Sequence, residues 1–207
     1  MTTPQAELGW PAPDFDLPGV DGRRWRLADC RGEHGTLVMF ICNHCPYVQA
    51  ILDRIIRDAC ELAGHGVRCV AISANDPAAY PEDSFDNMVR LAKEKDFPFP
   101  YLFDASQDVA RAYGAVCTPD FFGFDAGLRL RYRGRLDESR KELSPAPGES
   151  CSKRWFRLLV PVRGRPSNGR AWDARSNGAA RADELVLAAR SATGPRPTTS
   201  RTPIVVA

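Results

Sequence analysis

The stretch Thr36-Leu-Val-Met-Phe-Ile-Cys-Asn-His-Cys-Pro-Tyr47 decides how this chain folds. Its first half, residues 36–41, is an almost wholly apolar run with the length of a strand that is buried on both faces. Its second half places Cys42 and Cys45 three residues apart, with Pro46 directly after them. Because proline suits the first turn of a helix, the stretch predicts a strand, a short loop with both cysteines, and a helix.

Strand and helix signals continue to alternate along the chain. The helix after the cysteines is predicted from about residue 45 to 63, where apolar residues recur at i, i+3 and i+4. The further predicted elements are a buried strand at 67–74, a loop at 75–83, a helix at 84–95, a strand at 100–103, a helix at 106–113 capped by Ser106, and a hairpin of strands 121–124 and 128–132. This order predicts an α/β domain, in which a central mixed sheet is flanked by helices and carries a terminal β-hairpin.

Cys42 follows directly on a predicted strand, at the carboxyl edge of the sheet, where ligand chemistry gathers in such folds. A cysteine at a strand-to-helix junction meets unpaired N–H groups and the positive end of the helix dipole, which favour thiolate over thiol. A second cysteine one helical turn on can attack the mixed disulfide that the first one forms. We therefore predict that Cys42 is the attacking thiol and Cys45 the resolving thiol.

His44 lies between the two cysteines. An imidazolium there would stabilise the Cys42 thiolate further and make the centre more oxidising, so that His44→Pro should lower the reduction potential. Two other interpretations of the pair remain open, namely two buried thiols without chemistry and a zinc site with His44 and Cys117 as further ligands. No metal and no cofactor is predicted.

Four segments resemble the redoxin side of the thioredoxin superfamily, the AhpC/TSA or peroxiredoxin-like thioredoxin proteins. They are Gly9-Trp-Pro-Ala-Pro13-Asp-Phe-Asp-Leu, the stretch 36–47, Tyr113-Gly-Ala-Val-Cys-Thr-Pro119-Asp-Phe-Phe-Gly-Phe, and residues 127–133. The hexad Cys-Asn-His-Cys-Pro-Tyr marks a particular subgroup, and the resemblance extends from residue 9 to about 141.

The resemblance implies a thioredoxin-like fold and a thiol–disulfide oxidoreductase in cell redox homeostasis. It implies that Thr118-Pro119 is a cis-proline loop that lies against the two cysteines and pairs with substrate. Cys117 then falls near the redox pair, either as a small buried residue or as a third redox-active thiol. The expected partners are disulfide-containing proteins or small-molecule thiols and a thiol reductant system.

Two alternative functions stay open. The first is a peroxiredoxin-like thiol peroxidase with antioxidant activity, although neither Cys42 nor Cys45 has the proline of the peroxidatic Pro-x-x-x-Thr-x-x-Cys pattern. The second is a catalytically idle binding module that keeps the fold. The Trp-Cys-Gly-Pro-Cys motif of thioredoxin is absent as well, which argues against general pairing with thioredoxin reductase.

The bulk composition excludes other classes of function. A net charge of +2 over 207 residues predicts neither nucleic acid nor a membrane surface as partner, and no apolar run approaches the ~18 residues of a membrane span. Without an apolar leader at its start, the chain is expected to be cytoplasmic, where scattered cysteines are free thiols. Cys30, Cys60 and Cys69 are therefore predicted to have no role.

The chain changes character near residue 144. The net charge is −5 over residues 1–143 and +7 over residues 144–207, and the second segment is rich in Arg, Ser, Gly and Pro. We predict a redoxin domain at 1–143 and a disordered, low-complexity tail at 144–207. Codons for Arg170 to Gly178 can be chosen so that a shifted frame reads Ser-Met-Gly-Cys-Ser-Ile-Lys-Trp, close to the usual subgroup terminus. A frameshift between about residues 142 and 149 is thus a hypothesis that the nucleotide sequence decides.

Overall fold

A five-stranded mixed sheet forms the centre of the fold in the computed structural model, which describes residues 7–134. Its strands stand in the order β5-β4-β3-β6-β7. Strands β3, β4 and β5 are parallel, whereas β6 is antiparallel to both β3 and β7, so the mixed sheet and the terminal hairpin are confirmed. The elements are β1 Asp16–Pro18, β2 Arg24–Arg26, η1 Leu27–Cys30, β3 Gly35–Phe40, α1 Pro46–Gly64, β4 Val67–Ser73, η2 Pro81–Asp83, α2 Phe85–Glu94, β5 Tyr101–Phe103, α3 Asp108–Tyr113, β6 Asp120–Asp125 and β7 Leu130–Gly134.

Strand β3 occupies the middle of the sheet, and all six of its residues are buried. Successive side chains point to opposite faces of a strand, so Leu37 and Met39 join the core beneath α1, and Val38 and Phe40 join the core on the other face. A strand that is buried on both faces needs apolar residues at its odd and its even positions. The continuous run of apolar residues therefore correctly predicted a central strand.

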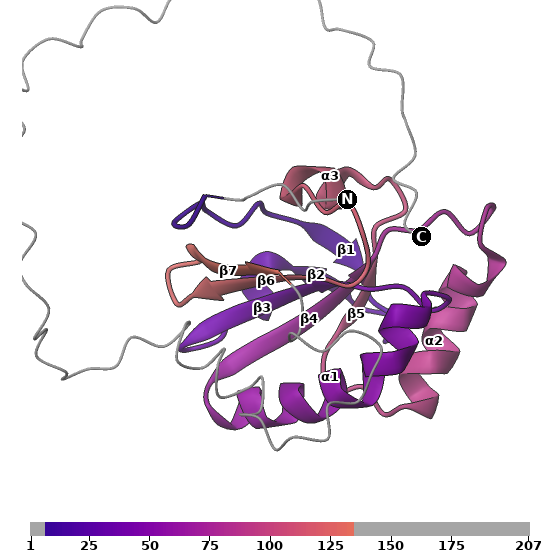
Figure 1. Cartoon of the computed structure of the whole chain (residues 1–207), viewed down its shortest axis with the longest axis horizontal. Coiled ribbons are helices and arrows are strands. Elements are labelled where there is room, and N and C mark those ends of the chain that lie inside the picture. The colour runs from indigo at the N-terminus through magenta and orange to yellow at the C-terminus, as the bar shows by residue number, and fades with distance from the viewer. Residues whose placement is uncertain (1–6, 135–207) are drawn as a thin grey trace, which may run out of the picture. The chain divides into compact units, whose positions relative to one another are not determined.

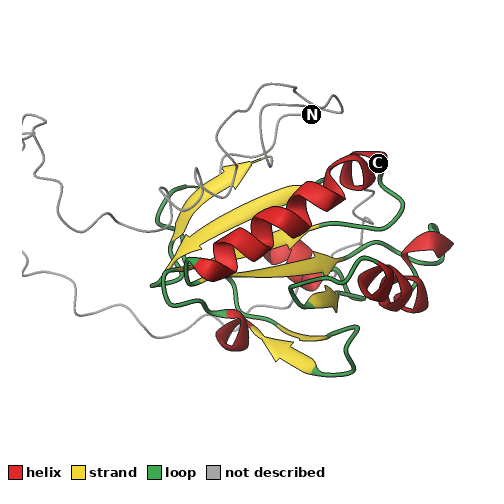
Figure 2. Ribbon diagram, turned by 90° about the horizontal axis from the view of Figure 1, so that it is seen from below, coloured by secondary structure: helices red, strands yellow, loops and turns green. Residues whose placement is uncertain are grey.

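Helices α1 and α2 cover one face of the sheet, and α3 lies on the other face together with β1 and β2 (Figure 1). Seen from below, α1 runs along the sheet over much of its length (Figure 2). Its buried residues Val48, Ile51, Ile55 and Leu62 form the apolar stripe that the sequence predicted. This packing fixes the start of α1, and with it the two cysteines, against the carboxyl end of β3.

Three details differ from the sequence prediction. Ser106 does not cap α3, because the helix begins at Asp108 after Gln107 in a left-handed conformation, and the Ser106 hydroxyl instead accepts a hydrogen bond from the Asp108 N–H. Strands β1 and β2 were not predicted, since each has only three residues and too little alternation to read. The turn η2 lies in the segment predicted as loop. The predicted tail at 144–207 lies outside the described residues.

Candidate active site

Both cysteines of the pair are free thiols, and each side chain is about 1% exposed. Cys42 follows β3 after one residue, and Cys45 is the residue that precedes the first turn of α1, with Pro46 in that turn. The two sulfurs are neighbours that influence each other's acidity, and the Cys45 thiol also donates to the Thr118 carbonyl oxygen. The strand, loop and helix around the pair are therefore as the sequence predicted.

The loop with Thr118 and Pro119 lies against this pair. The peptide bond between them is cis. The Thr118 hydroxyl is 3.2 Å from Cys42 Sγ, and the Thr118 carbonyl oxygen is 3.4 Å from Cys45 Sγ. The placement expected from the resemblance is thus confirmed, while a role of Thr118 and Pro119 in binding substrate stays a prediction. Cys117 is partly exposed in the same loop, so it is not the small buried residue of the first interpretation, and a redox role for it stays a prediction.

The two thiols differ in acidity. The pKa of Cys45 is lowered to about 5, because its sulfur accepts the Cys42 proton and because Thr118 and the first N–H groups of α1 favour its anion over the opposing effect of burial. The pKa of Cys42 is raised, since that proton is held between the sulfurs and the side chain is buried. The pair therefore releases its first proton readily and retains the second.

The start of α1 bears on the acidity of both cysteines. The sequence predicted a lowered pKa at Cys42, next to the strand, and this stays a prediction. In the structure α1 begins only after Cys45, so its unpaired N–H groups and the positive end of its dipole favour an anion at Cys45. The buried carboxylate of Asp83 raises the Cys42 pKa further.

A pH titration of the reduced chain tests the shared proton. The ultraviolet absorbance of thiolate should show one anion forming with a midpoint near pH 5, because the lowered pKa makes Cys45 anionic above that pH. Cys45→Ser should move the first titration of the site upward, and Cys60→Ser should leave it unchanged. A wild-type chain that forms its first thiolate only near the ordinary value of ~8.5 would contradict the sharing.

Asp83, in η2, is the residue of this site that sequence reasoning missed. Its carboxylate is fully buried and holds the loop between the cysteines. Oδ1 accepts the backbone N–H groups of Asn43 and His44 at 2.7 and 3.1 Å, and Oδ2 lies 2.5 Å from His44 Nδ1 and accepts the Asn75 side-chain amide at 2.7 Å. No sequence signal separates Asp83 from its acidic neighbours Asp76 and Glu82, because only the fold turns its side chain inward.

Cys42, His44 and Asp83 are also the group of described residues that could offer ligands to a cation, with one atom each within 4.8 Å. The ligands of a tetrahedral zinc, at ~2.1 Å from the metal, lie roughly 3.4 Å apart. His44 Nδ1 and Asp83 Oδ2 are closer than that, at 2.5 Å. The geometry is that of a hydrogen-bonded pair and does not favour the zinc alternative. Cys117, which that alternative used, is not in the group.

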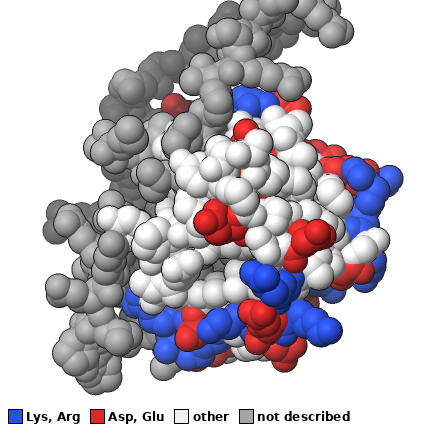
Figure 3. Space-filling model, turned by 90° about the vertical axis from the view of Figure 1, so that its right-hand side faces the viewer, with Lys and Arg blue, Asp and Glu red and all other residues white. Residues whose placement is uncertain are grey.

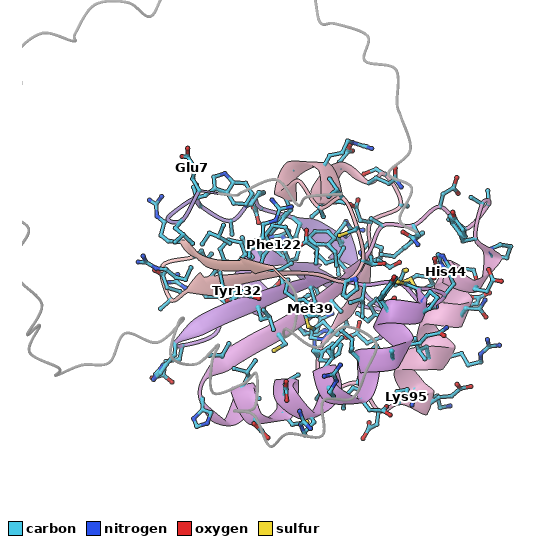
Figure 4. All side chains as sticks on the ribbon, viewed as in Figure 1. Glu7, Met39, His44, Lys95, Phe122 and Tyr132 are labelled. Carbon is cyan, nitrogen blue, oxygen red and sulfur yellow. The ribbon has the colours of Figure 1, made fainter. Side chains whose placement is uncertain are left out.

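A cleft of about 600 Å³ opens between α1 and α2, and Cys42 and His44 line it. Val48 and Leu52 of α1 and Leu91 of α2 give it apolar walls. Figure 4 places the labelled His44 at the end of the sheet near α2, where sulfur atoms are drawn beside it. Acidic and basic side chains are interspersed on the face drawn in Figure 3, so no single sign of charge dominates it. Cys42 borders this cleft although only about 1% of the residue is exposed.

Three further cysteines lie among the described residues, and the prediction that they have no role stays a prediction. Cys30 and Cys69 are buried, and burial raises the pKa of both thiols, that of Cys30 to about 12. Such thiols are protonated and poor nucleophiles near neutral pH. Cys60 is exposed on α1. Among residues 7–134, no helix combines the length and the apolar character that a membrane span requires.

Known proteins share this architecture. The model of the AhpC/TSA family matches residues 8–133. The thiol-disulfide oxidoreductase ResA of Geobacillus thermodenitrificans (strain NG80-2) is 27% identical over 131 residues, which are 60% of this chain and 67% of that protein. An uncharacterized conserved protein of Geobacillus kaustophilus superposes with a TM-score of 0.71 at 45% identity, over 79% of this chain and 89% of its own. A hypothetical protein of Sinorhizobium meliloti 1021 has a TM-score of 0.66 at 40% identity, over 72% and 80%.

Proposed function

Because the chain belongs to the AhpC/TSA family, we propose that it is a thiol–disulfide oxidoreductase whose redox centre is formed by Cys42 and Cys45. The observation that carries the proposal is the position of the Cys42 sulfur, which lines the cleft and has the sulfur of Cys45 as its neighbour. The similarity to a thiol-disulfide oxidoreductase supports the same class of reaction.

The reaction begins when Cys42 passes its proton to the anionic sulfur of Cys45 and becomes the thiolate. That thiolate attacks one sulfur of a substrate disulfide, breaks the S–S bond, forms a mixed disulfide and releases the other substrate sulfur. Cys45 then attacks the Cys42 sulfur of the mixed disulfide, the bond from Cys42 to the substrate breaks, and the second substrate sulfur leaves as a thiol with the proton that Cys45 gives up. Two electrons have moved from the protein to the substrate, and the Cys42–Cys45 disulfide is restored by a thiol reductant system.

The roles of the two sulfurs follow from access and acidity. Cys42 lines the cleft, so a substrate sulfur can approach it first. Cys45 is the neighbouring sulfur, so it is placed to share the Cys42 proton and later to resolve the mixed disulfide. His44 lies near Cys42 and contributes an imidazole to the same cleft. A positively charged imidazole would favour the Cys42 thiolate, whereas the negative charge of Asp83 disfavours it.

A change in reduction potential tests the contribution of His44. The expected direction is a lower potential without the imidazole, because the thiolate of the reduced form loses a positive neighbour. His44→Gln is the better variant, because His44→Pro would also remove the backbone N–H that binds Asp83. The potential is measured by equilibration with glutathione, and His34→Gln is the matched control. An unchanged potential in His44→Gln would remove the imidazole from the account.

Mass mapping after mild oxidation tests the proposed function as a whole. The reduced chain is treated with insulin or with glutathione disulfide, free thiols are alkylated, and peptides are identified. A disulfide between Cys42 and Cys45, formed as substrate thiols appear, is the expected product. A sulfenic acid formed with hydroperoxide, without disulfide reductase activity, would instead indicate a peroxidase. A pair that stays reduced in both treatments would indicate a binding module.

A further inference from the structure

His44 and Asp83 form a hydrogen-bonded pair directly beside the attacking sulfur. His44 Nδ1 lies 2.5 Å from Asp83 Oδ2, and the side chain of His44 is 21% exposed whereas that of Asp83 is 0% exposed. One side-chain atom each of Cys42, His44 and Asp83 lie within 4.8 Å of one another. The three groups are a thiol, an imidazole and a buried carboxylate.

Two neighbours hold the imidazole ring of His44. Asp83 holds Nδ1 from one edge, and Asp83 is itself held by Asn75 and by the backbone N–H of Asn43. The ring of Tyr80 stacks on that of His44, with centroids 4.3 Å apart and an interplanar angle of 7°. A ring held in this way keeps one orientation, with Nδ1 engaged and Nε2 as the nitrogen left to meet a group in the cleft.

We propose that His44 is a general acid that donates its Nε2 proton to the sulfur leaving the substrate disulfide, and that Asp83 is the positioning residue that orients the ring. The inference rests on the proposed function. When the Cys42 sulfur bonds to one substrate sulfur, the substrate S–S bond breaks and its electron pair goes to the other sulfur. That sulfur takes the proton from His44 and leaves as a thiol, and the neutral ring regains a proton from water.

The chemistry of the leaving group supports the general-acid role of His44. Thiol–disulfide exchange is slowed when the leaving thiolate is basic, and proton donation in the transition state removes that penalty. Asp83 engages Nδ1 and so orients the ring, which leaves Nε2 as the nitrogen that can hand a proton to the leaving sulfur. Because His44 and Cys42 line the same cleft, the acid and the nucleophile reach the same substrate.

The test compares disulfides with different leaving groups. The full chain, with its pair reduced, reacts with dithiobis(nitrobenzoate), whose leaving thiolate needs no proton, and with glutathione disulfide, whose leaving thiol is an ordinary one. In His44→Gln the rate with glutathione disulfide should fall on the order of 10²-fold, and at least about tenfold more than the rate with dithiobis(nitrobenzoate). The ratio of the two rates isolates the leaving group, because the nucleophile is the same in both reactions.

One further variant tests the role of Asp83, and a second variant is the control. Asp83→Asn should shift the same ratio in the same direction by a smaller factor, because the amide keeps an acceptor for the ring but loses its charge. His34→Gln, at the opposite end of β3, should leave the ratio unchanged. If the ratio in His44→Gln equals that of the wild type, the general-acid role is wrong, even when both rates are lower.

A measurement on the wild type removes the dependence on variants that fail to fold. Across a series of disulfides, its rate should depend less steeply on the leaving thiol's acidity than the rate of dithiothreitol does, since dithiothreitol has no histidine. An equal dependence would overturn the inference while leaving the proposed function intact. If Cys42 fails to react even with dithiobis(nitrobenzoate), the proposed function fails first, and the inference fails with it.

Discussion

Cys42→Ser is expected to abolish reduction of disulfide substrates, with a loss of at least about 10³-fold in rate. A serine hydroxyl has no accessible anion near neutral pH and forms no disulfide, so neither the mixed disulfide nor the internal one can appear. Insulin reduction and the release of thiols from glutathione disulfide both measure this loss.

Cys45→Ser gives the complementary result. The Cys42 sulfur can still attack, but the mixed disulfide has no resolving thiol and should accumulate as a covalent adduct detectable by mass spectrometry. Cys60→Ser is the matched control, because it removes an exposed thiol on α1, the helix that begins directly after Cys45. This variant should retain full activity. Retained activity in Cys42→Ser would show that another thiol performs the reaction.

Asp83→Ala is expected to destabilise the chain by about 3–5 kcal/mol, the cost of removing one partner of a buried charged network. The substitution leaves the N–H groups of Asn43 and His44, the His44 ring and the Asn75 amide without their acceptor. Each buried donor that loses its partner costs about 1–3 kcal/mol before water and local movement recover part of it. Urea unfolding followed by circular dichroism measures the change.

The control is another aspartate in an ion pair that water can reach. Asp53, whose side chain is 83% exposed, accepts a salt bridge from Lys95 at 2.9 Å. Exposed pairs of this kind contribute about 0–1 kcal/mol, so Asp53→Ala should change the unfolding free energy by no more than that. Equal effects of the two substitutions would mean that Asp83 does not hold the loop between the cysteines.

The sequence predicted the main elements because their signals are local. The apolar run of β3, the helical spacing in α1 and the turn between β6 and β7 each lie within a few residues, and each element formed within two residues of its expected bounds. The β1–β2 hairpin was missed because three-residue strands give too short a pattern. Ser106 was mistaken for a cap because Gln107 adopts a left-handed conformation that no residue pattern requires.

By itself the sequence determined that two cysteines stand between a buried strand and a helix, since strand and helix periodicity and the position of Pro46 are properties of neighbouring residues. Only the tertiary structure decided which carboxylate reaches the site and which groups surround the two sulfurs. Asp83 comes to Asn43 from 40 residues along the chain. The acidity of Cys45 depends on where α1 begins and on its contacts with Cys42 and Thr118. Electrostatic and hydrogen-bond energies act through space, so the order of residues alone does not contain them.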